Sequence, residues 1–315
     1  MRRVFVVVAV FLLTALSFVS VTAAEQGNTG VLRHFVTLPS GISGEGLAIH
    51  DGHFYVGTFS FTNADGTILV LDRHGTLTRT IRVPGLPGVG ELAFSEDGTL
   101  YAVAGNLNTG TGGSVFRVNP DSGTVAMVAS GFKLPNGLAI DDSGNLFVTD
   151  LLASQVYKIT PAGEVSVFAS GPLLGAALLP QVGLTLGTND LAFDRKGTAL
   201  YVTDVGLGTV VKIEVNEDGT AGTISNFALV PTPDGIAFDV KGNMYVTSPF
   251  TNSVQIVGKD GTAHALALDT SHVSLNNPSN VAFLGRQLYI TNLALAGTSE
   301  IDSTTVQHPG LPLDR

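Results

Sequence analysis

Six positions with oxygen-bearing or small side chains recur at nearly constant spacing along the 315-residue chain. They are separated by 45, 46, 53, 45 and 45 residues and are occupied by Glu45, Gly90, Asn136, Asn189, Asp234 and Ser279. Two carboxylates and two amides offer hard oxygen ligands, with no His or Cys among them. Such a set suits Ca²⁺ or Mg²⁺ better than Zn²⁺. If the repeat brings the six positions to one point, the two carboxylates would neutralise one divalent cation.

Without a cation, Glu45 and Asp234 would repel each other, and a carboxyl pKa would rise. Gly90 and Ser279 leave gaps, where water or substrate oxygens could complete a shell of about six to eight ligands. The alternative is that all six are ordinary turn residues, since Asn, Asp, Gly and Ser favour turns. Glu45 is the member that this alternative does not explain.

The chain around each position is itself repeated, which indicates the elements that would place these side chains. Two residues after each position comes a short apolar motif: Leu47-Ala48-Ile49, Leu92-Ala93-Phe94, Leu138-Ala139-Ile140, Leu191-Ala192-Phe193, Ile236-Ala237-Phe238 and Val281-Ala282-Phe283. After a polar turn a second motif follows: Phe54-Tyr55-Val56, Leu100-Tyr101-Ala102, Leu146-Phe147-Val148, Leu200-Tyr201-Val202, Met244-Tyr245-Val246 and Leu288-Tyr289-Ile290. Both motifs are rich in strand-forming residues.

Each repeat is predicted to form four short strands separated by turns. In the third repeat these strands are expected at 137–141, 146–150, 155–160 and 164–169. Four strands in about 45 residues are typical of a propeller blade, so six repeats predict an all-β, six-bladed β-propeller. The last repeat lacks a fourth strand, and a strand at 31–36 is expected to complete it and close the ring. The first strand of each blade lines the channel, which would place the six positions at one mouth.

Composition narrows the function classes. The chain has no Cys, so thiolate nucleophiles, thiolate metal sites and disulfides are excluded. A net charge of −10 disfavours a nucleic-acid partner.

Residues 1–24 combine Arg2 and Arg3 with a short apolar run and a small-residue end, which predicts a secretory signal peptide cleaved after Ala23 or Ala24. An uncleaved membrane anchor is the alternative. We therefore expect a secreted or periplasmic protein without stable membrane insertion, whose single domain spans 25–315.

Four segments resemble those of the regucalcin/gluconolactonase (senescence marker protein) family of six-bladed propellers. They are Gly44-Glu45-Gly46, Pro135-Asn136-Gly137-Leu138, Thr188-Asn189-Asp190 and Pro233-Asp234-Gly235-Ile236. The resemblance implies a divalent cation at the channel mouth, Ca²⁺ first, with Mg²⁺, Mn²⁺ or Zn²⁺ as alternatives. Its ligands would be Glu45, Asn136, Asn189 and Asp234, and Asp234 would also act as base or nucleophile. The implied activity is hydrolysis of a small-molecule lactone or ester, whose carbonyl the cation would polarise.

Two features bear on the substrate. No Arg near the mouth matches the sugar-binding basic residue of the family's sugar lactonases, and the one long interval carries about eight extra, Leu-rich residues between Ser170 and Asn189. This insertion predicts a lid or an apolar wall, with a short helix packed on the rim as the alternative. Candidate wall residues are Asp190, Leu173, Leu174, Phe59, Phe250 and His272. An alkyl or aryl lactone or ester is the expected substrate.

Two other functions stay open: a non-catalytic propeller that binds a ligand or partner around a structural cation, and a phosphotriesterase-like hydrolase.

Overall fold

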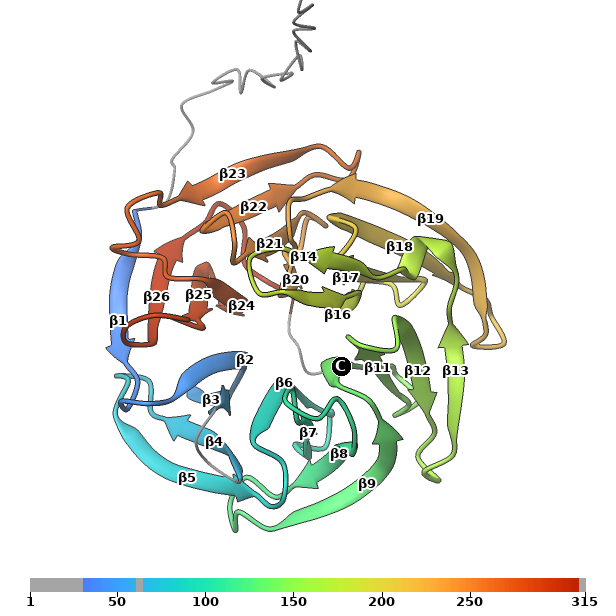
Figure 1. Cartoon of the computed structure of the whole chain (residues 1–315), viewed down its shortest axis with the longest axis horizontal. Coiled ribbons are helices and arrows are strands. Elements are labelled where there is room, and N and C mark those ends of the chain that lie inside the picture. Colours follow the sequence, from blue (N-terminus) through green and yellow to red (C-terminus); the bar gives the residue numbers. More distant parts are fainter. Residues whose placement is uncertain (1–30, 61–64, 312–315) are drawn as a thin grey trace, which may run out of the picture.

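Small antiparallel sheets are arranged around a central axis in the computed structural model (Figure 1). The structure describes residues 31–60 and 65–311, so the predicted signal peptide lies outside the described residues. Within these residues the only helical element is one 3₁₀ turn, η1 (Pro172–Leu174). The chain therefore has an all-β, propeller-like fold.

The repeating unit is a four-stranded antiparallel sheet whose strands follow one another in chain order. The third unit consists of β10 (Pro135–Ile140), β11 (Leu146–Asp150), β12 (Gln155–Ile159) and β13 (Val165–Ala169), each within two residues of its predicted bounds. Two further units have the same order: β16 (Thr188–Phe193), β17 (Ala199–Asp204), β18 (Thr209–Val215) and β19 (Ala221–Leu229), then β20 (Ile236–Phe238), β21 (Met244–Ser248), β22 (Ser253–Val257) and β23 (Ala263–Leu268).

The first two repeats form one eight-stranded sheet. Its strands are β2 (Ser43–His50), β3 (His53–Phe59), β4 (Gly66–Leu71) and β5 (Leu77–Val83), followed by β6 (Gly88–Phe94), β7 (Leu100–Gly105), β8 (Gly113–Val118) and β9 (Val125–Phe132). Each half keeps the sequential order of the other units. The halves are joined where Phe59 of β3 pairs with Gly88 of β6.

The last sheet joins the two ends of the described chain. It contains β24 (Pro278–Leu284), β25 (Gln287–Asn292), β26 (Glu300–Thr305) and, at its edge, β1 (Arg33–Thr37). β1 runs antiparallel to β26, with His34 opposite Asp302. The Phe35 ring lies 4.8 Å from Phe54 and 5.0 Å from Tyr289, centroid to centroid. The expected pairing of the N-terminal strand with the last repeat is therefore present.

The first strands of the units surround the axis. β2, β6, β10, β16, β20 and β24 contact one another in that order, and β24 contacts β2. The hydrophobic core lies between neighbouring sheets: for example, Phe147 of β11 packs edge-on against Phe193 of β16, with 5.1 Å between ring centroids. The sheets therefore pack face to face around the channel.

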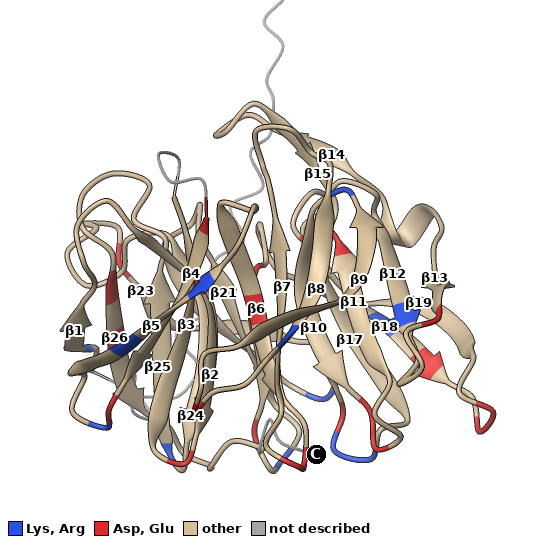
Figure 2. Cartoon of the chain, turned by 90° about the horizontal axis from the view of Figure 1, so that it is seen from below, with Lys and Arg blue, Asp and Glu red and all other residues tan. Residues whose placement is uncertain are grey.

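The two ends of the channel differ. At one end the insertion forms a hairpin, β14 (Ala177–Leu179) and β15 (Leu184–Leu186), which stands above the disc (Figure 2). At the other end the C-terminal segment lies against the turns of two units, with the Leu311 amide donating to the Phe238 carbonyl at 2.8 Å. None of the helices in the described part of the chain is long and apolar enough to cross a membrane.

Candidate active site and metal centre

The six repeated positions lie at irregularities in the first strands. Five of them fall within a register shift between the first and second strand of their unit, namely Glu45, Gly90, Asn136, Asn189 and Ser279. The sixth, Asp234, lies two residues before β20, and its amide donates to the Thr247 carbonyl at 2.9 Å. A bulge bends a strand and redirects one side chain. For the five bulged positions, strand pairing therefore continues on both sides of the residue.

One cavity of about 150 Å³ contains all four predicted ligands, which come from four different units. The Asn136 amide donates a hydrogen bond to Glu45 Oε1 at 3.2 Å. The Asn189 amide donates to Asp234 Oδ1 at 2.8 Å. The ring thus brings together two amide–carboxylate pairs. The other two positions contribute no side chain to the group, because Gly90 has none and the Ser279 hydroxyl donates to the backbone of Gly44 at 3.0 Å.

Two acceptor atoms of this group have no hydrogen-bond partner although they are shielded from solvent: Glu45 Oε2 and Asn189 Oδ1. Burial raises the pKa of Glu45 to about 7, although the bond from Asn136 lowers it. Burial and then the neighbouring Glu45 charge raise the pKa of Asp234 well above its ordinary value. Orphaned buried oxygens and clustered carboxyls are costly in a protein interior. A hard divalent cation would coordinate the unpaired oxygens and offset the charge of the two carboxylates. The four residues therefore fit such an ion.

A second polar layer lies next to the first and was not predicted as a group. It consists of Glu91, Asp190 and Asn280, each directly following one of the repeated positions, and all three line a separate cavity of about 70 Å³. The Asn280 amide donates to Glu91 Oε2. The Leu191 and Ile236 amides donate to Asp190 at 2.7 and 3.0 Å. Burial raises the pKa of Asp190 to about 7, and burial and the Asp190 charge raise that of Glu91.

Glycines alternate with these three residues around the axis, because there is no room for six side chains. A Cβ added to Gly46, Gly137 or Gly235 would lie 2.7, 2.7 or 2.6 Å from the Cα of Glu91, Asp190 or Asn280, respectively. Real Cβ atoms do not approach so closely. The alternation of Gly with a polar residue after each repeated position was the sequence signal for this layer.

The walls of the larger cavity are apolar. No Lys, Arg or His is among the described residues that line it, and its only charged or amide side chains are the four candidate ligands. The remaining lining side chains are Phe59, Val89, Leu107, Leu134, Pro135, Leu151, Val182, Leu184, Leu186, Val205, Pro249, Phe250, Leu293 and Leu295. The hairpin therefore contributes to the wall, as do two of the candidate wall residues, Phe59 and Phe250.

The other candidate wall residues lie elsewhere. Leu174 is fully buried and Leu173 partly buried in the core cluster between β11 and β17, because η1 packs down on the rim. His272 is exposed, and its Nδ1 lies 2.9 Å from the Asn252 amide. Asp190 belongs to the second polar layer rather than to the wall. The part of the insertion that reaches the cavity is β15 and the turn before it, not the Leu-rich start.

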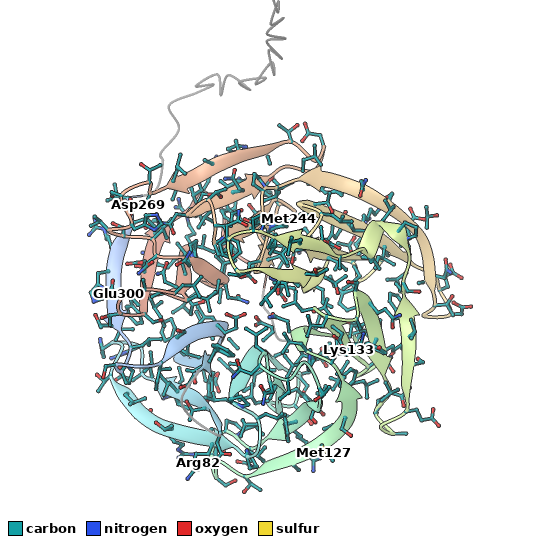
Figure 3. All side chains as sticks on the ribbon, viewed as in Figure 1. Arg82, Met127, Lys133, Met244, Asp269 and Glu300 are labelled. Atoms are coloured by element: carbon teal, nitrogen blue, oxygen red, sulfur yellow. The ribbon has the colours of Figure 1, made fainter. Side chains whose placement is uncertain are left out.

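One further group could hold a metal ion. His34, Glu300 and Asp302 place ligand atoms within 4.8 Å of one another. They lie on the paired strands β1 and β26, and Glu300 is at the rim of the disc (Figure 3). His34 Nδ1 is 3.3 Å from Glu300 Oε2, an ordinary partly exposed ion pair when the ring is protonated. Asp302 accepts a hydrogen bond from Asn292 at 2.8 Å. This group is remote from the apolar cavity.

Fold and site together define a propeller-like protein with an acidic, apolar-walled cavity at one end of its channel. Residues 177–294 match the family described as SMP-30/Gluconolactonase/LRE-like region. This match confirms the predicted resemblance to the regucalcin/gluconolactonase family. The matched segment contains Asn189 and Asp234, half of the candidate ligand set.

Solved structures share the fold at low sequence identity. A gluconolactonase from Xanthomonas campestris is 18% identical, with a TM-score of 0.65 over 88% of this chain and 89% of that one. A luciferin-regenerating enzyme is 14% identical, with a TM-score of 0.67 over 90% and 99%. An auxiliary nutrient binding protein from Bacteroides thetaiotaomicron is 12% identical, with a TM-score of 0.65 over 87% and 75%. The fold thus occurs both in enzymes and in a binding protein, and function must be argued from the site.

Proposed function

We propose that this protein is a divalent-cation-dependent hydrolase of apolar lactones or esters. The observation that carries the proposal is the cavity in which Glu45, Asn136, Asn189 and Asp234 meet beneath apolar walls. The family match supports hydrolysis of a lactone, because gluconolactonases give the family its name. Ca²⁺ is the first candidate ion, since all four side chains offer hard oxygen atoms.

We also interpret the ring as six blades. The eight-stranded sheet counts as two blades, because its halves repeat the four-strand order and are joined at the pair Phe59–Gly88. The closed cycle of six first strands supports this count. For residues 1–24 we propose a cleaved secretory signal, and hence a secreted or periplasmic protein.

The chain's own residues would each have a defined part in hydrolysis. A bound cation supplies Lewis-acid polarisation of the substrate carbonyl and stabilises negative charge on its oxygen. Asp234 would accept the proton of the attacking water and return it to the alkoxide as the acyl C–O bond breaks. In the variant, its carboxylate attacks the carbonyl directly, the alkoxide leaves with a proton from water, and the remaining hydroxide cleaves the acyl–Asp234 bond. The bond from the Asn189 amide restrains the Asp234 carboxylate, and the bond from Asn136 does the same for Glu45. The apolar walls would exclude bulk water, which strengthens these electrostatic interactions.

The wall composition favours an alkyl or aryl substrate over a polyhydroxylated sugar lactone. A sugar brings several hydroxyl groups that need hydrogen-bond partners once desolvated. Among the described lining residues, only the four candidate ligands offer side chains that could be such partners. An alkyl or aryl group would instead bury its surface against β15, Phe59 and Phe250.

The test uses cation-free protein prepared with EDTA. Ca²⁺, Mg²⁺, Mn²⁺ and Zn²⁺ are titrated by calorimetry, and turnover is measured on alkyl lactones of increasing chain length, aryl esters, an aryl phosphotriester and gluconolactone. We expect Ca²⁺ to restore hydrolysis of alkyl lactones or aryl esters, and Asp234→Ala to abolish it. Activity that persists in EDTA and in Asp234→Ala would refute the mechanism. Tight cation binding without turnover would favour a binding protein, and phosphotriester turnover alone would favour the third function.

A further inference from the structure

Four buried threonines link the units around the cavity, and the mechanism above does not use them. Thr149, Thr203, Thr247 and Thr291 occupy the same position in the second strand of successive units, and each is 0% exposed. A buried hydroxyl needs a partner. Their partners lie both in the neighbouring unit and in the first strand of their own unit.

Each threonine hydroxyl donates to the backbone carbonyl of the next repeated position around the ring. Thr149 donates to Asn189. Thr203 donates to Asp234 at 2.6 Å, and Thr291 donates to Glu45 at 3.0 Å. Three of the four candidate ligands are therefore held by a side chain from the preceding unit.

The same hydroxyls accept hydrogen bonds from their own unit. Thr149 Oγ1 accepts from the Gly137 amide at 2.7 Å, and Thr203 Oγ1 accepts from the Asp190 amide at 2.8 Å. Each of these two hydroxyls thus bridges the first strand of its own unit and the repeated position of the next unit. Backbone groups at a break in strand pairing lack some of the usual strand-to-strand hydrogen bonds. The threonine hydroxyl supplies hydrogen bonds at such a break and so restrains the backbone next to a candidate ligand.

Thr247 makes the same kind of bond to a residue that is not a candidate ligand. Its hydroxyl donates to the Ser279 carbonyl at 2.7 Å. Gly57 and Val103 take the corresponding position in the first two units, where a Cβ on Gly57 would lie 2.3 Å from the Gly90 oxygen. The hydroxyl bond is therefore missing in the first two units, which have Gly57 and Val103 in place of a threonine. Three of the four threonines bond the backbone of a candidate ligand. Thr247 serves as a control, because its hydroxyl donates to Ser279, which is not a candidate ligand.

We infer that Thr149 and Thr203 are positioning residues for cation binding, fixing the backbones of Asn189 and Asp234 from the neighbouring unit. This inference rests on the proposed function. Loss of a residue that orients a metal ligand typically weakens metal binding by about 10–100-fold. Thr→Val removes the hydroxyl and keeps the shape of the side chain, so it tests the bond with little change in packing.

The experiment compares the wild type with Thr149→Val, Thr203→Val and Thr247→Val. Ca²⁺ affinity is measured by calorimetry, and the unfolding midpoint is measured in EDTA. We expect about tenfold weaker Ca²⁺ binding in Thr149→Val and Thr203→Val, near wild-type affinity in Thr247→Val, and similar midpoint losses in all three. Thr203→Ser keeps the hydroxyl and should bind as the wild type does.

Three outcomes overturn the inference alone: unchanged affinity in both test variants, equal weakening in Thr247→Val, or tenfold weaker binding in Thr203→Ser. If Thr203→Val does not fold, the Ser variant and Thr149→Val decide. Failure of the wild type to bind any of Ca²⁺, Mg²⁺, Mn²⁺ and Zn²⁺ overturns the proposed function and this inference together. The two failures are therefore distinguishable.

Discussion

The Asn189 amide donates a 2.8 Å hydrogen bond to Asp234 Oδ1 across the boundary between two units, while Asn189 Oδ1 has no partner. Both residues are nearly buried, at 5% and 6% exposed. One amide thus restrains a carboxylate and presents an unsatisfied oxygen to the same cavity. A cation bound at the cavity, as proposed above, would coordinate that oxygen and offset the charge of the carboxylate.

Replacing Asp234 should therefore affect cation binding and hydrolysis together. Asp234→Asn keeps the side-chain shape but removes the charge, so we expect Ca²⁺ affinity to fall at least tenfold and kcat/KM at least a hundredfold. Calorimetry and initial rates at saturating Ca²⁺ measure the two effects. The control is Asp218→Asn, an exposed carboxylate, which should behave as the wild type. Normal turnover in Asp234→Asn would contradict the role assigned to it.

Cation binding should stabilise the protein through this cavity and not through the ring-closing strand. Adding Ca²⁺ to EDTA-treated protein should raise the unfolding midpoint, because the ion binds the folded chain alone. We expect the rise to persist in His34→Ala and to disappear in Glu45→Gln. Differential scanning calorimetry measures it. The opposite pattern would assign the stabilising ion to the group formed by His34, Glu300 and Asp302.

The hairpin should set the preference for apolar substrates. Leu184 of β15 lines the cavity, whereas Leu178 of β14 is 62% exposed and does not. Leu184→Asn should lower kcat/KM for long alkyl lactones about tenfold by removing apolar contact. Leu178→Asn, a matched change on the same hairpin, should leave it within twofold. Equal effects would show that the hairpin acts only through its overall structure.

Asp204 should make stability depend on pH. Burial raises the pKa of its carboxyl to about 6, from an ordinary 3.8, and its Oδ2 has no hydrogen-bond partner. The folded state then holds the proton more strongly than the unfolded state, so the stability present at pH 4 is lost as pH rises through 6.

Asp204→Asn removes this loss, because the amide stays neutral and can still accept the 2.8 Å bond from the Leu207 amide. Relative to the wild type, we expect it to gain about 1–3 kcal/mol between pH 4 and pH 8. Urea unfolding at the two pH values measures the difference. A variant with the same pH dependence as the wild type would rule out Asp204 as its source.

The Phe35 side chain should stabilise the packing of β1 against the first and last units. Its ring contacts Phe54 of β3 and Tyr289 of β25, so it joins the two ends of the described chain. Phe35→Ala should cost about 2–4 kcal/mol of unfolding free energy, since a partly buried aromatic is removed. Val31→Ala, at a side chain that is 72% exposed, is the control. Chemical denaturation measures both, and equal stability of the two variants would argue against this contact.

Much of this molecule could be predicted from one chain because its pattern is periodic. The spacing of 45 or 46 residues gave the strand order of each unit, and a strand near 31–36 without a partner predicted the pairing of β1 with β26. The group Glu45, Asn136, Asn189 and Asp234 could also be predicted, because equivalent positions of a closed ring converge on its axis. Local patterns of this kind depend only on residue type and spacing.

Tertiary structure decided what spacing does not encode. Leu173 and Leu174 are as apolar as the residues of a cavity wall, but η1 places them in the hydrophobic core. Val182, Leu184 and Leu186 line the cavity instead. Asp190 follows a candidate ligand in sequence, yet the pleat directs it to the second layer with Glu91 and Asn280. The threonine bonds join residues of different units. Each of these outcomes depends on how neighbouring sheets pack against one another, which the periodicity of a single repeat does not specify.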